Sequence, residues 1–322
     1  MKTETNPITL KIIIILFLSI SLVLSLQSCK SDKKQNKSED ASIVKDNIIN
    51  ILTENMDFQM ADTIPSGWNT FRYKNASPQT HFFLIDKYPE AITLDSVKAR
   101  VLPPFDNGMK LINEGKTEAG FAEFGKLPSW FMELKNLGGS GLISPGLVAE
   151  TIVKLDPGYY IIECYVKMSN GVWHTSMGMA KEVIVSETNS GNVEPKADIE
   201  ITISSTDGIT FNDTISKGQH CFSVFYKDQI VHENFIGHDI NLAKLEENAN
   251  LDEINSWMDW SNPKGLIEPA PTGVTFLGGV NNMSEGQKGY FTVNLEPGRY
   301  ILISEVPNPA SKNMLKTFVV PE

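Results

Sequence analysis

Apolar residues occur along most of the chain in short stretches rather than in long helical periods. Thr70–Tyr73, Phe82–Ile85 and Glu150–Leu155 are typical: they are rich in β-branched and aromatic residues and are bounded by Gly, Pro and Asn. This pattern predicts β-strands. Pro157-Gly158 separates the third stretch from Tyr159–Val166 and predicts a turn between antiparallel strands. We therefore expect a protein rich in β-structure.

A few segments have helical spacing instead. Thr93 is a suitable capping residue, and apolar positions near a period of 3.6 follow it, which predicts a helix over Thr93–Val101. Later in the chain, Asn241–Glu247 and Leu251–Trp260 occupy the corresponding place and are expected to be helical. Short strands interrupted by one helical insertion favour a two-sheet sandwich.

The N-terminal segment has a different pattern. Lys2 and Lys11 precede a continuous apolar-rich run over Ile12–Leu26, which is short for a membrane-spanning helix but typical of a signal-peptide core. The run ends in Leu26-Gln27-Ser28-Cys29, which resembles the lipobox of bacterial lipoproteins. The resemblance implies cleavage before Cys29 and a lipid anchor on that residue. An uncleaved anchor helix and an ordinary secretory signal are the alternatives.

Polar residues of mixed charge follow Cys29 as far as Asp46, without any aromatic residue, and predict a flexible tether over residues 29–46. Similar charged segments occur in lipoproteins exported to the surface of some bacteria. We therefore expect the protein in the bacterial cell envelope, lipid-anchored on the periplasmic side or at the outer-membrane surface. The net charge of −11 argues against a nucleic-acid partner, because phosphate binding requires an excess of basic side chains.

The chain contains an internal repeat. Residues 62–67 recur in modified form at 213–218, an offset of 151, and residues 155–160 recur at 295–300, an offset of 140. The matches stay in order, and the change in offset falls in the middle of the unit, where loops vary. The repeat therefore indicates a tandem duplication.

Together these patterns predict an all-β protein of two tandem Greek-key β-sandwiches, each with a short helical insertion. The expected order is a signal peptide over residues 1–28, a tether over 29–46, a first sandwich over 47–186 and a second over 197–322. The polar segment Glu187–Lys196 is expected to link the two sandwiches.

Four residues with metal-binding side chains belong to the first sandwich. Cys164 ends a predicted strand, and His174 and Met179 follow after a turn at Ser169–Gly171. His81 lies far upstream, after an Asn-containing turn. Two His, one Cys and a weak axial Met are the ligand set of a blue-copper electron-transfer site, because thiolate suits Cu(I) and imidazole serves both oxidation states.

These residues resemble the cupredoxin family, with its plastocyanin-like copper-binding domains. The match consists of the turn before His81, the Pro-Gly-Tyr-Tyr strand that ends in Cys164, and the four residues between His174 and Met179. The resemblance implies copper as the cofactor, with His81, Cys164 and His174 as equatorial ligands and Met179 as the axial ligand. Met177 is the alternative axial ligand. The resemblance also implies that electrons leave through His174 near the domain tip.

The second copy lacks this ligand set. Ser304 stands at the cysteine position, and alignment of the last strands puts Pro309 at the position of the second histidine. Only His232, which the offset of 151 assigns to the first histidine position, and Met314 remain. The second sandwich is therefore expected to have lost the metal.

Several interpretations stay open. Cys164 is alternatively a buried free thiol or the partner of Cys221 in a disulfide, which export would allow. His220 and His238 are expected to be packed or exposed rather than metal-binding. His232 and His238 are six residues apart, so both cannot face one metal from a helix.

No motif indicates catalytic machinery. The neighbours of Cys164 are Glu163 and Tyr165, whereas a copper nitrite reductase would carry a His there. The sequence therefore predicts a membrane-anchored copper-binding lipoprotein that exchanges one electron with a redox partner protein, or handles copper. The alternative is a surface lipoprotein without metal, whose two β-sandwiches act as protein-interaction or structural modules.

Overall fold

The computed structural model describes residues 48–212 and 214–322. The predicted signal peptide, the lipid-bearing Cys29 and the tether over residues 29–46 lie outside these residues. Within the described residues, no helix has both the length and the apolar character needed to cross a membrane. The described residues belong to one compact unit, Lys45–Glu322.

Seven strands form the framework of residues 48–189, which we call the first half. They are β1 (Ile48–Thr53), β2 (Thr63–Asn75), β3 (Leu84–Lys87), β4 (Lys135–Gly139), β5 (Val148–Leu155), β6 (Gly158–Glu163) and β7 (Ala180–Asn189). β2 and β5 contain Thr70–Tyr73 and Glu150–Leu155, which confirms these predictions. Phe82–Ile85 and Tyr159–Val166 lie only partly in strands, because β3 begins at Leu84 and β6 ends at Glu163. The predicted linker is shorter than expected, because β7 continues to Asn189.

The second half, residues 199–322, repeats this order with one additional short strand. Its strands are β8 (Ile199–Ser204), β9 (Gly208–Thr210), β10 (Gly218–Tyr226), β11 (Ile240–Leu245), β12 (Val274–Val280), β13 (Lys288–Leu295), β14 (Gly298–Ile303) and β15 (Leu315–Val320).

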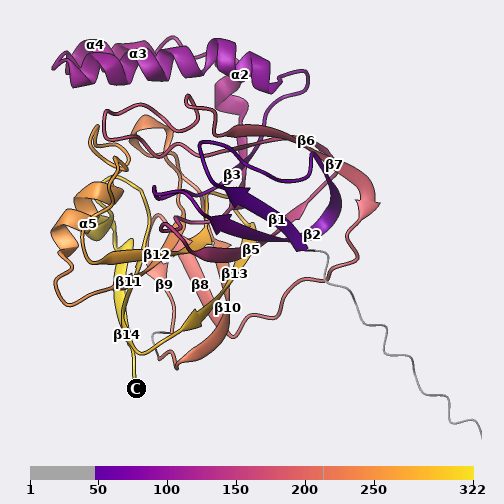
Figure 1. Cartoon of the computed structure of the whole chain (residues 1–322), viewed down its shortest axis with the longest axis vertical. Coiled ribbons are helices and arrows are strands. Elements are labelled where there is room, and N and C mark those ends of the chain that lie inside the picture. The colour runs from indigo at the N-terminus through magenta and orange to yellow at the C-terminus, as the bar shows by residue number, and fades with distance from the viewer. Residues whose placement is uncertain (1–47, 213) are drawn as a thin grey trace, which may run out of the picture. The chain divides into compact units, whose positions relative to one another are not determined.

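The helices of the first half lie together along one side of the strands (Figure 1). They are α2 (Leu94–Arg100), α3 (Leu102–Asn113), α4 (Thr117–Phe124) and the 3₁₀ helix η1 (Ser129–Glu133). α2 confirms the predicted helix, since the Thr93 hydroxyl accepts a hydrogen bond from the Ser96 N–H. α3 and α4 were not predicted, and they make the insertion longer than expected. Two glycines let α3 and α4 approach closely, because a Cβ on Gly120 would lie 2.7 Å from the Gly108 carbonyl oxygen.

The second half has fewer helical residues, in η2 (Glu233–Phe235), α5 (Leu251–Met258) and η3 (Pro309–Lys312). α5 confirms the helix predicted over Leu251–Trp260. The helix predicted over Asn241–Glu247 is wrong, because this segment lies mainly in β11. β11 pairs with β12 on one edge and β14 on the other and is almost wholly buried. A strand buried on both faces loses the alternation that would identify it.

The strands of each half form the two layers of an open sandwich, as predicted. In the first half β2 pairs with β1 and β5 over most of its length, and its first residues pair with β7. β6 pairs with β3 and β7. β5 and β6 do not pair with each other, so the turn at Pro157-Gly158 carries the chain from one layer to the other instead of closing a hairpin.

The two halves share one continuous sheet through antiparallel pairing of β5 with β13. Thr151 lies opposite Phe291, and these positions differ by the repeat offset of 140. Two isolated bridges are likewise equivalent at this offset: Leu137–Met283 and Ile143–Leu277. Each half thus presents the same surface to the other, an approximate two-fold relation that supports a tandem duplication.

One hydrophobic core runs through both halves, and a smaller cluster lies against the helices. β6 separates the two. Tyr160 and Ile162 belong to the main core, whereas Ile161 packs with Val97 and Val101 of the smaller cluster. The two faces of β6 therefore serve different layers.

Candidate metal centre

Cys164 directly follows β6, and strand alternation decides which way its side chain points. Because successive side chains of a strand face opposite ways, Cys164 continues the face of Tyr160 and Ile162 and is wholly buried. Its N–H donates to the carbonyl oxygen of Met179 at 3.2 Å. This bond holds the cysteine against the segment that returns toward β7.

His81 lies between β2 and β3, and its backbone is fixed by Ile143. The N–H of each residue donates to the carbonyl oxygen of the other, at 3.2 and 2.7 Å. The preceding loop is held by Asn75, whose amide donates to the carbonyl oxygens of Gln79 and Ile143, both at 2.8 Å. The Asn-containing turn noted in the sequence therefore orders the loop that carries His81.

Two hydrogen bonds attach the loop from Cys164 to Met179 to its own beginning, and a third joins its end to His174. The His174 N–H donates to the Val166 carbonyl oxygen at 2.8 Å, and the Thr175 hydroxyl donates to the Cys164 carbonyl oxygen at 2.8 Å. The Met179 N–H donates to the His174 carbonyl oxygen at 3.0 Å. Backbone contacts thus fix His174 relative to Cys164 although ten positions separate them.

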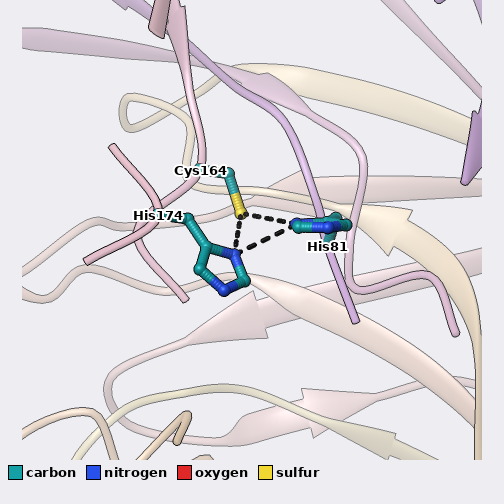
Figure 2. A group of neighbouring side chains, drawn as sticks. All are labelled: His81, Cys164 and His174. Carbon is teal, nitrogen blue, oxygen red and sulfur yellow. Dashed lines mark hydrogen bonds between the residues drawn. The ribbon is translucent and has the colours of Figure 1, made fainter. Parts of the chain in front are cut away.

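The two histidines and the cysteine converge inside the first half, and Figure 2 shows the three side chains pointing toward one another. The sulfur of Cys164 lies 3.8 Å from Nδ1 of His81 and 3.7 Å from Nδ1 of His174, and the two nitrogens are 3.1 Å apart. A point equidistant from these atoms in their plane lies about 2.1 Å from each, whereas zinc–imidazole bonds measure roughly 2.0–2.1 Å and zinc–thiolate bonds roughly 2.3 Å. The three donors therefore surround a space of the size that a metal ion requires.

Burial keeps both imidazoles neutral. It lowers the pKa of His81 to about 3, helped by the facing His174, and it lowers the pKa of His174 to about 4. Neutral imidazole is the form that binds metals. Nε2 of each ring has no hydrogen-bond partner among the described residues, so the polar contacts of both rings run through Nδ1.

Burial also shifts the pKa of the Cys164 thiol. It raises the pKa of Cys164 to about 12, and backbone hydrogen bonds from Phe82 and Val166 oppose this increase. Without a metal, Cys164 is therefore a protonated thiol at neutral pH, and a metal that binds it must displace that proton. The sequence had no signal for these two backbone donors, because any residue other than proline carries an N–H.

The two methionines of the loop differ. Met179 is wholly buried, whereas Met177 is 51% exposed. Burial favours Met179 over Met177 as an axial ligand, and its axial role remains a prediction. His174 is also wholly buried, and the exit of electrons through it remains a prediction. The loop folds back over it between Trp173 and Met177, whose N–H donates to the carbonyl oxygens of both Trp173 and His174.

Strand register corrects one residue of the second copy. The repeat offset assigns His232 to the position of His81, but the structure assigns His238. Gly139 and Gly279 are equivalent in the repeat, and they pair with Leu84 and Asn241. Leu84 lies three positions after His81, and Asn241 lies three positions after His238. The simple offset fails because the loop before β11 is longer than the loop before β3.

Ser304 and Pro309 occupy the positions of Cys164 and His174, as the sequence predicted. The Ser304 N–H donates to the Met314 carbonyl oxygen at 3.0 Å, as Cys164 does to its own methionine. The Met314 N–H donates to the Pro309 carbonyl oxygen at 2.9 Å, which repeats the bond to His174. The second half therefore keeps the backbone frame of the site but has a hydroxyl and a proline in place of two donors.

Polar side chains in the second half bond to one another at this position. The Ser304 hydroxyl donates to a carboxylate oxygen of Asp239 at 2.6 Å, and the Glu305 N–H donates to the same oxygen at 2.8 Å. Burial raises the pKa of Asp239 to about 6. Among the described residues, the cluster of His81, Cys164 and His174 is the one group of three or more potential ligands that could share a metal ion.

The remaining histidines have other partners. Nδ1 of His220 lies 2.6 Å from a carboxylate oxygen of Asp198, which indicates a structural role. Nε2 of His232 lies 3.2 Å from Nε2 of His238. From one regular helix the two side chains could not face the same point, but an irregular loop around η2 carries both residues and lets them meet.

The two described cysteines, Cys164 and Cys221, are both free. The alternative in which they form a disulfide is therefore wrong. Cys221 is half-buried in β10, as expected for a residue packed in a strand.

Comparisons with known proteins identify likenesses of fold. No family model matches the chain, and no curated protein matches it. Among solved structures, a reduced auracyanin from Roseiflexus castenholzii is 22% identical, with 42% of this chain and 94% of that chain covered and a TM-score of 0.26. Auracyanin A from Chloroflexus aurantiacus, described as a blue copper protein, is 20% identical, with coverages of 43% and 98% and a TM-score of 0.26.

A multicopper oxidase is 14% identical, with 84% of this chain and 87% of that chain covered and a TM-score of 0.20. At such TM-scores the likenesses add no argument about chemistry. The case for the site rests on its own geometry.

Proposed function

We propose that this protein binds one copper ion through His81, Cys164 and His174, with Met179 as axial ligand, and that it carries single electrons. The observation behind the proposal is the convergence of two imidazole nitrogens and one sulfur, all buried, around a metal-sized space. Two His and one Cys with a weak thioether favour copper in an electron-transfer role. Bound copper would supply the change between Cu(I) and Cu(II).

The described residues would hold the donors rather than move them. Ile143 and Asn75 fix His81, and the hydrogen bonds of the loop fix His174 against the strand of Cys164. A rigid site suits electron transfer, because little has to rearrange when the charge of the metal changes. A site that delivers copper needs a ligand that a recipient protein can reach, whereas these three residues are wholly buried. Burial therefore favours electron transfer over copper delivery.

Copper loading tests the proposal. Residues 45–322 contain the whole of the described core, so this segment is the protein for the measurement. With one equivalent of Cu(II), we expect an intense visible band from thiolate-to-copper charge transfer. Cys164→Ser should abolish the band, and Cys221→Ser should leave it unchanged as the matched control.

Two results would contradict the proposal. Copper binding without a visible band would mean that the thiolate is not a ligand. A protein that binds Cu(II) no better than Cys164→Ser would favour the alternative of two β-sandwiches that serve as protein-interaction modules. Zinc also accepts His and Cys ligands, so a zinc competition run in parallel identifies the preferred metal.

We also propose that the protein is a lipoprotein of the bacterial cell envelope, held at a membrane by lipid on Cys29, with a redox protein as its partner. The support is the apolar run over Ile12–Leu26 and the small residue directly before Cys29. Mass spectrometry of the mature full chain should find acyl groups on Cys29. Cys29→Ser should remove them and release the protein from membranes, and an unmodified Cys29 would refute the anchor.

A further inference from the structure

A pocket of about 170 Å³ lies beside the candidate metal centre. It forms between α3 and η1 of the helical insertion, the chain segments that carry Cys164 and His174, and loops of the second half. Its aromatic walls include Phe105, Phe131, Trp173, Phe235 and Trp260. Met132 and Val231 also line it and are 65% exposed, so the pocket opens to solvent.

The pocket and the candidate metal centre share the same backbone. Glu163 and Tyr165, on either side of Cys164, line the pocket, and so do Trp173 and Thr175, on either side of His174. Cys164 continues from β6, so strand alternation turns its neighbours Glu163 and Tyr165 away from the side to which the sulfur points. A molecule in the pocket would therefore lie just across this segment from the sulfur of Cys164.

The walls favour a flat aromatic ring. The Phe105 ring centre lies 5.9 Å from that of Phe131 and 6.4 Å from that of Phe235, both edge to face, and Trp173 stacks on Trp260 at 5.5 Å. Aromatic rings prefer such offset or edge-on neighbours. A cavity of roughly 150 Å³ lined by apolar side chains holds benzene. The volume of this pocket therefore suits one ring with a small substituent.

Two residues that line the pocket carry unpaired donors that an acceptor on this substituent could satisfy. The indole N–H groups of Trp173 and Trp260 are buried and have no hydrogen-bond partner among the described residues. Buried N–H groups are rarely left without an acceptor. Glu163 and Asn136 also line the pocket, but the Asn136 amide N–H already donates to the Asp86 carboxylate at 2.7 Å and the Glu163 carboxyl also interacts with Asp86, so the two indoles are the unpaired groups.

We propose that this pocket binds a small, neutral molecule with a single aromatic ring and an oxygen that accepts hydrogen bonds from Trp173 and Trp260. This binding site goes beyond the proposed function and does not depend on it. Its test uses metal-free protein, so a failure of the copper proposal would leave the result intact.

Three probes separate the contributions of ring and oxygen in calorimetric titrations of residues 45–322. Benzamide has both features, toluene has the ring without the oxygen, and cyclohexanecarboxamide has the oxygen without the aromatic ring. Benzamide should bind at least about tenfold more tightly than either of the others, because each of them leaves one part of the site unmatched. Equal affinity for all three, or no binding of benzamide, would overturn the proposal.

The five tryptophans provide a local readout. In spectra of protein labelled with ¹⁵N at tryptophan, benzamide should move the indole N–H signals of Trp173 and Trp260 most. The Trp257 signal should move little, since its N–H already donates to the Ile267 carbonyl oxygen at 2.7 Å. Trp260→Phe should weaken benzamide binding about fivefold through the loss of one donor.

Trp68→Phe is the matched control for this substitution, because Trp68 packs on Tyr290 and does not line the pocket. Leu102→Trp, which places bulk in the pocket, should abolish binding. Benzamide affinity that neither Trp260→Phe nor Leu102→Trp changes would place the binding elsewhere and overturn the proposal.

Discussion

The two halves of this protein share one backbone frame but have different side chains at the same positions. In the first half, Cys164, His81 and His174 bring three donor atoms within 3.8 Å of one another. In the second half Ser304 and Pro309 stand at two of these positions, although the same pair of backbone bonds holds them. The backbone frame therefore forms whether or not the candidate ligands are present, so the frame and these side chains can change independently.

The second half also shows how a buried site is filled when the donors are replaced. Ser304 bonds to Asp239, and Glu305 accepts a hydrogen bond from the Tyr165 hydroxyl of the first half. Buried polar groups need partners, and here Ser304, Asp239 and Glu305 bond to one another and to Tyr165. This network joins the halves, since Tyr165 and Glu305 are equivalent at the repeat offset of 140 and contact each other.

The largest expected effect compares the two equivalent histidines. His81→Gln should lower copper affinity at least about a thousandfold, or about 4 kcal/mol, because it removes one of three strong donors. His238→Gln should leave affinity and stoichiometry unchanged. Competitive titration with a copper chelator measures both variants, and circular dichroism checks that each is folded. Equal losses in the two variants would mean that the second half takes part in metal binding.

A smaller effect concerns pH in the metal-free protein. Burial lowers the pKa of His238 to about 4, helped by His232 and opposed by Asp228. The unfolded chain, with an ordinary histidine pKa near 6.5, therefore takes up this proton first. The stabilisation from neutral His238 is complete above about pH 6.5 and is lost as pH falls through about 4.

Urea unfolding of wild type and His238→Gln at several pH values checks this expectation. As pH falls from about 6 to 4.5, the unfolding free energy of wild type should decrease relative to that of His238→Gln. The relative decrease should be at most about 1.4 kcal/mol per pH unit, the slope for one proton. A constant difference over this range would show that His238 does not titrate with unfolding.

The smallest effect tests the equivalence of the halves directly. The hydroxyls of Tyr160 and Tyr300 each donate to the carbonyl oxygen four residues earlier, of Asp156 and Glu296, both at 2.7 Å. Tyr160→Phe should lower the free energy of unfolding by about 1 kcal/mol, the typical net value of one hydrogen bond, and Tyr300→Phe by about 1–2 kcal/mol, because its hydroxyl also accepts from the Glu296 N–H at 3.1 Å. Losses in urea unfolding that differ by more than about 1 kcal/mol would contradict equal roles.

Much of the fold could be predicted from local pattern. The strands around Thr70–Tyr73 and Glu150–Leu155 and the helix capped by Thr93 follow from residue type and spacing. The segment Asn241–Glu247 was misassigned because pairing on both edges buries both of its faces. α3 was missed although Leu102, Phe105 and Met109 have helical spacing and Pro103 and Pro104 suit a first turn.

In the candidate site, too, some features could be predicted from the sequence and others depend on the fold. The sequence by itself determined the donor types and their order along the chain, because residue identity alone decides which side chains can bind a metal. It also determined the repeat and the loss of donors at Ser304 and Pro309. These features are local, and a linear comparison of the chain with itself detects them.

Only the tertiary structure decided the rest. It brought His81 to Cys164 across 83 positions, buried His174, assigned His238 rather than His232 to the equivalent position, and formed the aromatic pocket from both halves. These outcomes depend on strand register, on loops of unequal length and on packing between distant segments. The sequence records such contacts only as scattered residues, because the energy that selects them comes from burial in the folded chain.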